Sequence, residues 1–329
     1  MKKISAAQTA AYVSLFVSIL VLTLKVKAYY VTHSSAVLSD ALETVVNVVT
    51  AFIALYAVKL AAEPADSNHP YGHGKMEYFS AAFEGGLIFF AALAILYSGA
   101  VAFFQNTEVH NYAEGFYYSL AATIINLLTG LYLLNVGRKS NSEALMASGK
   151  HVLSDVVTTL GVFLSLGLVY IFKDPRIDAV ISLCLGLLLA REAYKIVRVN
   201  SGALLDEADE ELLEKLSLSL EQNRTAPVID IHHLRMIRSG NFHHIDAHLV
   251  VPEFYDIKTV HDISNDFEKA VVTQYEFDGE FAFHTDPCHR LYCAVCRVEA
   301  CPVREQAFKN LKPWTTQHIV AGPRYSEQE

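Results

Sequence analysis

The sequence predicts an α-helical membrane domain of six transmembrane helices, followed by a small α+β domain in water. Of the 329 residues, 52% are hydrophobic and 19% are charged, whereas soluble globular proteins average about 45–50% and 25%. Apolar runs of the length that crosses a bilayer, about 20 residues, occur only before residue 205. We therefore expect a six-helix membrane domain over residues 1–204, a cytoplasmic domain over 205–290 and a cysteine-containing tail over 291–329.

Six stretches are long and apolar enough to form the membrane helices. They are about Ala10–Tyr30, Ala36–Ala61, Phe79–Phe104, Phe116–Asn135, Ala144–Phe172 and Ile177–Val197. The first stretch lacks the short apolar region and small-residue cleavage pattern of a signal peptide, so we keep it as a span.

Lysine and arginine residues flank these spans unevenly. They lie before the first span and after the second, fourth and sixth, whereas the connections at residues 31–35 and 105–112 contain none. Because positive residues stay in the cytoplasm, we expect a multi-pass protein with both termini there, in the inner (plasma) membrane of a bacterium. The formal net charge of −9 argues against a nucleic-acid partner, since phosphate binding needs a basic face.

Two spans carry polar and ionisable side chains at membrane depth, where each charge costs a few kcal/mol and so marks a functional candidate. The second span contains Asp40, Glu43 and Asn47, and the fifth contains His151 and Asp155. Residues four apart lie on one face of a helix, so each span presents a pair of ligands.

Glu43, Asn47, His151 and Asp155 together offer three oxygen ligands and one imidazole, which suit a divalent first-row metal. His151 also changes protonation near neutral pH. The alternative is that these side chains only join helices by hydrogen bonds, which costs more for a carboxylate than for an amide.

The residues around these positions resemble the cation diffusion facilitator family. The second span reads SAVLSDALETVVN over residues 35–47, and the next loop reads PADSNHPYGHGKME over residues 64–77, a pattern highly specific to that family. The fifth span reads HVLSD over residues 151–155, and HTDPC over residues 284–288 resembles the family's C-terminal metal motif. The likeness runs from about residue 8 to residue 288.

The resemblance implies a homodimer of six-helix protomers with ferredoxin-like cytoplasmic domains. Such proteins are secondary active transporters, not enzymes, and export zinc, iron, manganese or cobalt in exchange for protons. By position, the transport site is Glu43, Asn47, His151 and Asp155, but Asp or His is usual at the first of these positions and Asp at the second. Because an amide weakens the site, a metal-responsive sensor or assembly protein without significant flux is the alternative function.

The loop after the second span contains three further candidate ligands, Asp66, His69 and His73. Pro70 and Gly72 between the histidines predict a turn. These side chains can bind one ion or form a solvated polar loop, and the resemblance assigns Asp66 and His73 as ligands.

The predicted cytoplasmic domain has the order helix, strand, strand, helix, strand. The expected elements are Asp209–Gln222, Val228–Arg238, Phe242–Val251, Thr259–Val272 and Phe281–His284. This order gives a small sheet with helices on one face.

Histidines are dense in this domain. Any one of them alone is more simply a core or solvated residue. The resemblance implies that five residues bind regulatory divalent metal near the dimer interface, and these are His232, His248, His261, His284 and Asp286.

The tail contains Cys288, Cys293, Cys296 and Cys301, in the spacing C-x4-C-x2-C-x4-C. Disulfides are not expected in a reducing cytoplasm. The four residues are either a four-cysteine zinc site, with an iron–sulfur cluster as the second metal option, or ordinary reduced thiols. From Pro302 onward we expect a loosely structured tail.

Overall fold

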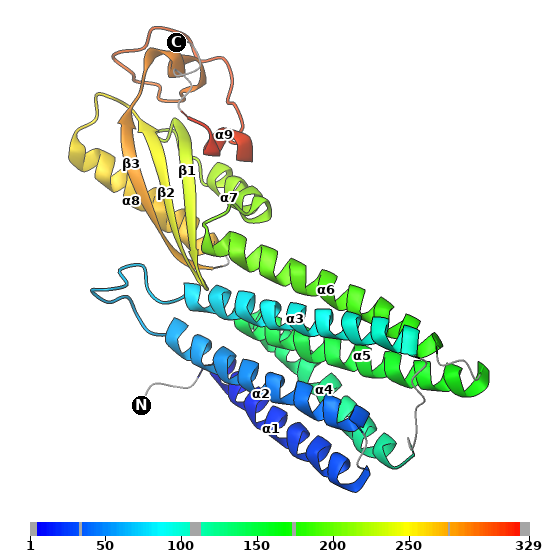
Figure 1. Cartoon of the computed structure of the whole chain (residues 1–329). Coiled ribbons are helices and arrows are strands. Elements are labelled where there is room, and N and C mark those ends of the chain that lie inside the picture. Colours follow the sequence, from blue (N-terminus) through cyan, green and yellow to red (C-terminus); the bar gives the residue numbers. More distant parts are fainter. Residues whose placement is uncertain (1–4, 33–34, 106–112, 173–175, 276, 323–329) are drawn as a thin grey trace. The chain divides into compact units, whose positions relative to one another are not determined.

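The computed structural model describes residues 5–32, 35–105, 113–172, 176–275 and 277–322 (Figure 1). The chain forms two compact units, Met1–Leu205 and Asp206–Glu329. Each unit has its own buried apolar clusters, because the apolar and the charged parts of the sequence fold separately.

The first unit is a bundle of long helices that lie side by side (Figure 1). The described residues form six helices of 27 to 31 residues, α1 (Ala6–Thr32), α2 (Ser35–Ala61), α3 (Lys75–Gln105), α4 (Ala113–Ser140), α5 (Glu143–Phe172) and α6 (Arg176–Leu204). Helix α1 packs against α2 and α4, α3 packs against α6, and α5 packs against α2, α3, α4 and α6.

Small residues allow these helices to approach closely. A Cβ atom on Gly130 of α4 would lie 2.7 Å from the Cγ atom of Leu153 in α5. Large apolar side chains point outward instead, and Phe16, Phe90 and Tyr97 are 69%, 70% and 73% exposed. A bundle with a small-residue interior and an apolar exterior is suited to lipid rather than to water.

Three of the helices contain stretches long and apolar enough to cross a membrane, within the residues that the structure describes. These stretches are Ala6–Lys27, Lys75–Val101 and Leu120–Ser140. Helix α2 has a shorter apolar stretch, Asn47–Ala61, within its described side chains. The expected helices are present, and six membrane crossings stay a prediction.

The second unit contains a small mixed sheet. Its elements are α7 (Glu210–Gln222), β1 (Asp230–Ser239), β2 (Phe242–Val251), α8 (Ile257–Gln274) and β3 (Asp278–Pro287). Strands β1 and β2 are antiparallel around a turn at Gly240, whose φ is 63°, and β2 and β3 are parallel. Helix α8 makes the crossover that a parallel pair requires.

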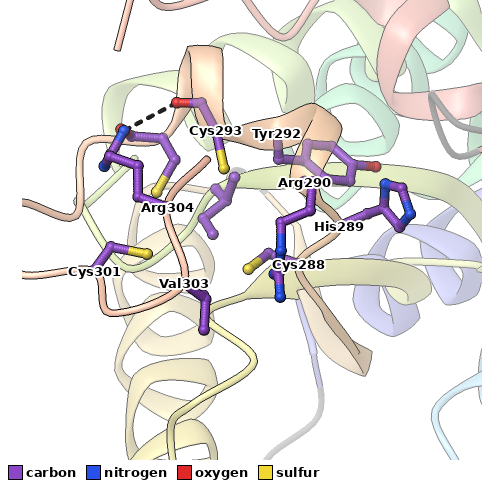
Figure 2. A pocket seen from close by; sticks show the side chains of 10 residues that line it. Cys288, His289, Arg290, Tyr292, Cys293, Cys301, Val303 and Arg304 are labelled. Atoms are coloured by element: carbon purple, nitrogen blue, oxygen red, sulfur yellow. Dashed lines mark hydrogen bonds between the residues drawn. The ribbon is translucent and has the colours of Figure 1, made fainter. Parts of the chain in front are cut away.

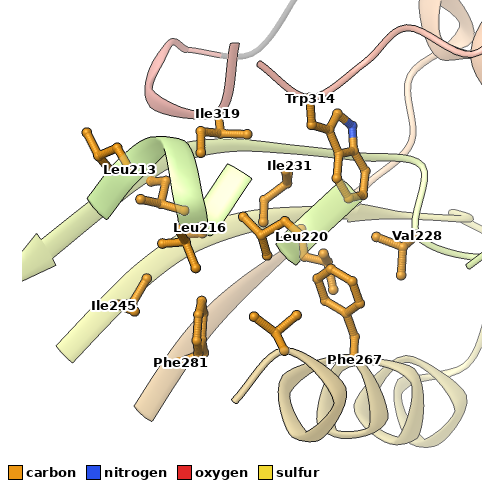
Figure 3. Packing of buried hydrophobic residues seen from close by; sticks show 14 of the residues in the cluster. Leu213, Leu216, Leu220, Val228, Ile231, Ile245, Phe267, Phe281, Trp314 and Ile319 are labelled. Carbon is orange, nitrogen blue, oxygen red and sulfur yellow. The ribbon is translucent and has the colours of Figure 1, made fainter. Parts of the chain in front are cut away.

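One face of the sheet builds the core of this unit (Figure 3). Side chains alternate along each strand, so Ile231, Ile245 and Phe281 point to the same side. They pack against Leu216 of α7 and Phe267 of α8, which are 0% and 4% exposed. In β2 and β3, and in β1 as far as His232, the even-numbered residues therefore belong to the opposite face, and they include His232, His248 and His284.

The chain beyond β3 also packs on this unit, so the expectation of a loosely structured tail after Pro302 is wrong for the described residues, which end at 322. A short 3-10 helix, η1 (Arg290–Val295), and helix α9 (Thr316–Val320) lie in this segment. Trp314 and Ile319 join the core and are 2% and 0% exposed (Figure 3). These two apolar residues anchor the far end of this polar stretch on the core.

Trp314 is fixed by three different interactions. Its ring packs in the core, and its indole Nε1 donates a 3.1 Å hydrogen bond to Asp230 Oδ1. The guanidinium carbon of Arg224 lies 4.1 Å from the centre of the ring. The side chain thus contacts both a buried carboxylate and a cation, in addition to the core.

Replacing Trp314 by alanine should lower the free energy of unfolding of the second unit by about 3–5 kcal/mol, the usual cost of removing a buried aromatic side chain. Hydrogen–deuterium exchange of the full-length protein in detergent measures this as faster exchange in α7 and β1. Phe308→Ala is the matched control, because Phe308 is 47% exposed in the same segment. Equal protection in both variants would contradict the anchoring role of Trp314.

Candidate metal centres

Three polar side chains meet at the buried contact between α2 and α5. Asn47 Nδ2 donates a 2.5 Å hydrogen bond to Asp155 Oδ2, and Asn47 Oδ1 lies 2.7 Å from His151 Nε2. Asn47, His151 and Asp155 are 6%, 6% and 8% exposed. The packing of α2 on α5 thus brings together one predicted ligand of α2 and the pair four residues apart on α5.

The hydrogen bonds of Asn47 define the tautomer of His151. A carboxylate only accepts hydrogen bonds, so the amide nitrogen of Asn47 faces Asp155 and its oxygen faces His151. His151 Nε2 therefore carries the proton, and its Nδ1 lies 3.9 Å from Asp155 Oδ1. A cation that takes these atoms as ligands displaces internal hydrogen bonds rather than water alone.

Glu43, the fourth predicted ligand, lies on the backbone of α2, but its side chain is outside the described part of the structure. The same holds for Asp40. Glu43 precedes Asn47 by one helical turn, which places both positions on the same face of α2. Its role as a ligand stays a prediction.

Glu84 is a buried carboxylate near this cluster that the sequence interpretation missed. It lies on α3, is 2% exposed and interacts electrostatically with His151 and Asp155. Ser148 Oγ donates a 2.9 Å hydrogen bond to Glu84 Oε2, whereas Glu84 Oε1 has no hydrogen-bond partner. The sequence could have identified Glu84, because an ionisable residue inside an apolar stretch marks a functional candidate.

The loop between α2 and α3 folds around Asp66. Asp66 Oδ1 accepts hydrogen bonds from the backbone amides of Asn68 and His69, at 2.8 and 2.7 Å, and the His69 amide has the largest part in lowering the pKa of Asp66. Asp66 Oδ2 lies 3.5 Å from His73 Nε2. Gly72, with φ of 77°, makes the turn between the histidines.

Asp66, His69 and His73 therefore form a compact group whose ligand atoms all lie within 4.8 Å of one another. The carboxylate is ionised and held by the loop itself, so the group is arranged before any ion binds. Metal binding by this loop stays a prediction.

The sheet of the second unit places three histidines in a row. Strand register pairs His232 of β1 with His248 of β2, and His248 with His284 of β3. Paired residues on neighbouring strands point to the same face, here the face opposite the core. Asp286 follows His284 by two residues and shares that face.

Asp286 is the centre of this group. Its Oδ2 lies 3.3 Å from His232 Nε2 and 3.0 Å from His248 Nδ1, and its Oδ1 lies 3.5 Å from His284 Nε2. The ligand atoms of His232, His248 and Asp286 all lie within 4.8 Å of one another. One carboxylate and two or three imidazoles are a ligand set that suits zinc.

His232 is 1% exposed, and neither of its ring nitrogens has a hydrogen-bond partner. Burial lowers the pKa of His232 to about 4, although Asp230 and Asp286 oppose the shift. The ring is therefore neutral at pH 7, the form that binds a metal ion. A cation beside Asp286 would satisfy an otherwise unpaired buried nitrogen.

A bulge in β1 brings in His233, which the sequence interpretation did not select. The register shifts between His232 and Arg235, and His233 has a φ of 53°, rare for a residue other than glycine. The ring centres of His232 and His233 both lie 5.2 Å from that of His248. No regular strand pattern signals such a bulge.

The structure does not bring His261 into this group. It lies exposed near the start of α8, and α8 packs on the core face of the sheet. A ligand role for His261 stays a prediction.

The four tail cysteines line one small cavity (Figure 2). Cys293 and Cys296 are buried, Cys288 and Cys301 are partly buried, and all four are free thiols. Burial raises the pKa of the Cys288 thiol, and the nearby Cys296 and Cys301 add to that rise. Without a cation the Cys288 thiol is thus held in the protonated form.

Known proteins resemble the chain along most of its length. The family model "Cation efflux transmembrane domain" matches residues 11–205, and the model "Cation efflux protein, cytoplasmic domain" matches residues 206–288. An uncharacterized transporter of Synechocystis sp. is 33% identical over 80% of this chain and 86% of its own length. The cation-efflux pump FieF of Escherichia coli is 26% identical over 85% of this chain and 92% of its own length.

Replacing Asp286 by asparagine should weaken zinc binding to the second unit at least about tenfold, because the shared charge between the histidines is lost. Competition with a chromophoric chelator measures this on the purified full-length protein. Asp278→Asn is the control, since Asp278 begins the same strand and is exposed. Unchanged affinity in Asp286→Asn would remove this group as a metal centre.

Proposed function

Because the chain belongs to the cation diffusion facilitator family of cation efflux transporters, we propose that it exports a divalent transition-metal ion in exchange for protons. The buried group of Asn47, His151 and Asp155 is the observation that supports this proposal most directly. Two helices that pack against each other provide these ligands, so movement of one helix relative to the other changes the site.

The donor set favours zinc, with iron, cobalt and manganese as the other candidates. His151 supplies a nitrogen ligand, and Asp155, Asn47 and Glu43 supply oxygen ligands, a mixture typical of first-row divalent metals. An amide in place of a carboxylate gives the site one negative charge fewer and one proton acceptor fewer. We expect weaker metal retention and fewer protons per ion than for a site with a second aspartate.

Proton exchange follows from competition for the same atoms. On the cytoplasmic side, where the metal is captured, His151 and Asp155 bind the ion in their deprotonated forms. On the outer side, protons take these ligand atoms and the hydrogen bonds through Asn47 re-form, which releases the ion. The metal ion and the protons shift the helix bundle between the arrangement open to the cytoplasm and the arrangement open to the outside. Each does so only as far as its affinities for these two arrangements differ.

The remaining groups have accessory roles in this proposal. The chain acts as a homodimer in the inner membrane. Both termini lie in the cytoplasm, as the distribution of lysine and arginine predicts. The loop group at Asp66 receives ions on the cytoplasmic side. The group at Asp286 binds cytosolic metal and stabilises one arrangement of the dimer.

Asp155→Ala should abolish zinc uptake into proteoliposomes, because the only carboxylate seen in the described intramembrane group is removed. Asn126→Ala is the control: Asn126 of α4 is also a buried polar residue, 8% exposed, outside this group. Zinc flux should fall to background in the first variant and persist in the second. Normal flux in Asp155→Ala would remove this site from the transport path.

Glu84→Gln tests whether the buried carboxyl group of Glu84 exchanges protons with this site. We expect zinc uptake to continue with fewer protons moved per ion and a flatter dependence on pH, since the amide cannot ionise. Ser148→Ala is the control, because it removes the hydrogen bond to Glu84 Oε2 and keeps the carboxyl group. An unchanged proton-to-zinc ratio in Glu84→Gln would exclude a proton-carrying role.

A further inference from the structure

The four cysteines after β3 lie at the border of the family resemblance or beyond it. The matched cytoplasmic domain ends at residue 288, so Cys293, Cys296 and Cys301 belong to a segment that neither family model covers. The segment has little regular structure, apart from η1 and α9 in the described residues. It still folds against the sheet, which raises the question of what holds it.

The fold brings all four thiols to one place although they come from different parts of the segment. Cys288 directly follows β3, where its backbone amide donates a 2.8 Å hydrogen bond to the carbonyl of Val251. Cys293 lies in η1, Cys296 ends it, and Cys301 returns from the next loop. Figure 2 shows their side chains around a common cavity.

Arg304 wraps the loop around this cavity. Its guanidinium group donates hydrogen bonds to the backbone carbonyls of Cys293 and Cys296, both at 3.1 Å, and to that of Val298 at 2.6 Å. One positive side chain that also lines the cavity thus fixes the backbone of the turn that carries Cys293 and Cys296.

The size of the cavity separates the possible occupants. Its volume is about 10 Å³, roughly the space of a single water molecule. One metal ion fits such a space with small side-chain rotations, whereas a cluster of several iron and sulfide ions needs the loop to open. Besides the four cysteines, the lining contains the apolar side chains of Ile229 and Val303.

The thiols are not yet at ligand spacing. In the described part of the chain, two other groups have all their ligand atoms within 4.8 Å, the ones at Asp66 and Asp286. Around zinc, with Zn–S distances of about 2.3 Å, tetrahedral sulfur atoms lie about 3.8 Å apart. Binding of a zinc ion therefore requires the cysteine side chains to turn toward the cavity.

We propose that Cys288, Cys293, Cys296 and Cys301 bind one structural zinc ion as a closed tetrahedral site, which fastens the C-terminal segment to the sheet. Four protein ligands leave no open coordination position, so this ion is neither cargo nor exchangeable regulator. The site is independent of the transport proposal, because it uses none of the same residues.

Cobalt replacement in the purified, metal-stripped full-length protein tests this site. Thiolate ligands give cobalt(II) an intense charge-transfer absorption, which histidine and carboxylate ligands do not, so the other centres stay silent. We expect this band to saturate at one cobalt per chain and to disappear when one equivalent of zinc is added. Cys293→Ser should lose most of the band, and Cys184→Ser, at the fifth free thiol in α6, should keep it.

Absence of the thiolate band in the parent protein would overturn the proposal. An iron–sulfur spectrum with acid-labile sulfide in the protein as purified would overturn the single-ion site in favour of a cluster. If Cys293→Ser fails to fold, the zinc content of the parent protein tests the proposal instead. A mercurial reagent should then release one chelator-resistant zinc per chain, and release of none contradicts the site.

Discussion

The proposed transport function depends on one buried side chain, the amide of Asn47, which bridges His151 and Asp155 between two helices. A second carboxylate at this position would repel Asp155 unless a cation or a proton were present. The amide instead satisfies both partners in the metal-free state, so the helices pack without an ion. The amide therefore stabilises the metal-free contact between α2 and α5, and it leaves the site with less negative charge to bind a metal ion.

Much of this arrangement could be predicted from residue spacing. Pairs four residues apart defined the ligand faces of α2 and α5, and the order of elements in the second unit followed from its hydrophobic pattern. The histidine row required only that paired strands point their side chains to one face, as His248 and His284 do. Local periodicity was sufficient wherever the structure is regular.

The other features of the sites depend on tertiary contacts, which local sequence patterns do not predict. Glu84 becomes part of the membrane group only because α3 packs against α5, and His233 reaches His248 only through a bulge. Trp314 anchors the tail from the middle of a polar stretch, where composition alone predicts disorder. His261 shows the reverse, since its helix packs on the other face of the sheet from the histidine row.

The most direct test of the account measures ion and proton movement together in proteoliposomes containing the full-length protein and an internal pH dye, with zinc, iron(II), cobalt, manganese and cadmium in turn. The account predicts saturable flux of a divalent ion, zinc first, with protons moving in the opposite direction. Binding of metal to the cytoplasmic domain without flux of any ion would contradict it and identify the protein as a metal-responsive sensor.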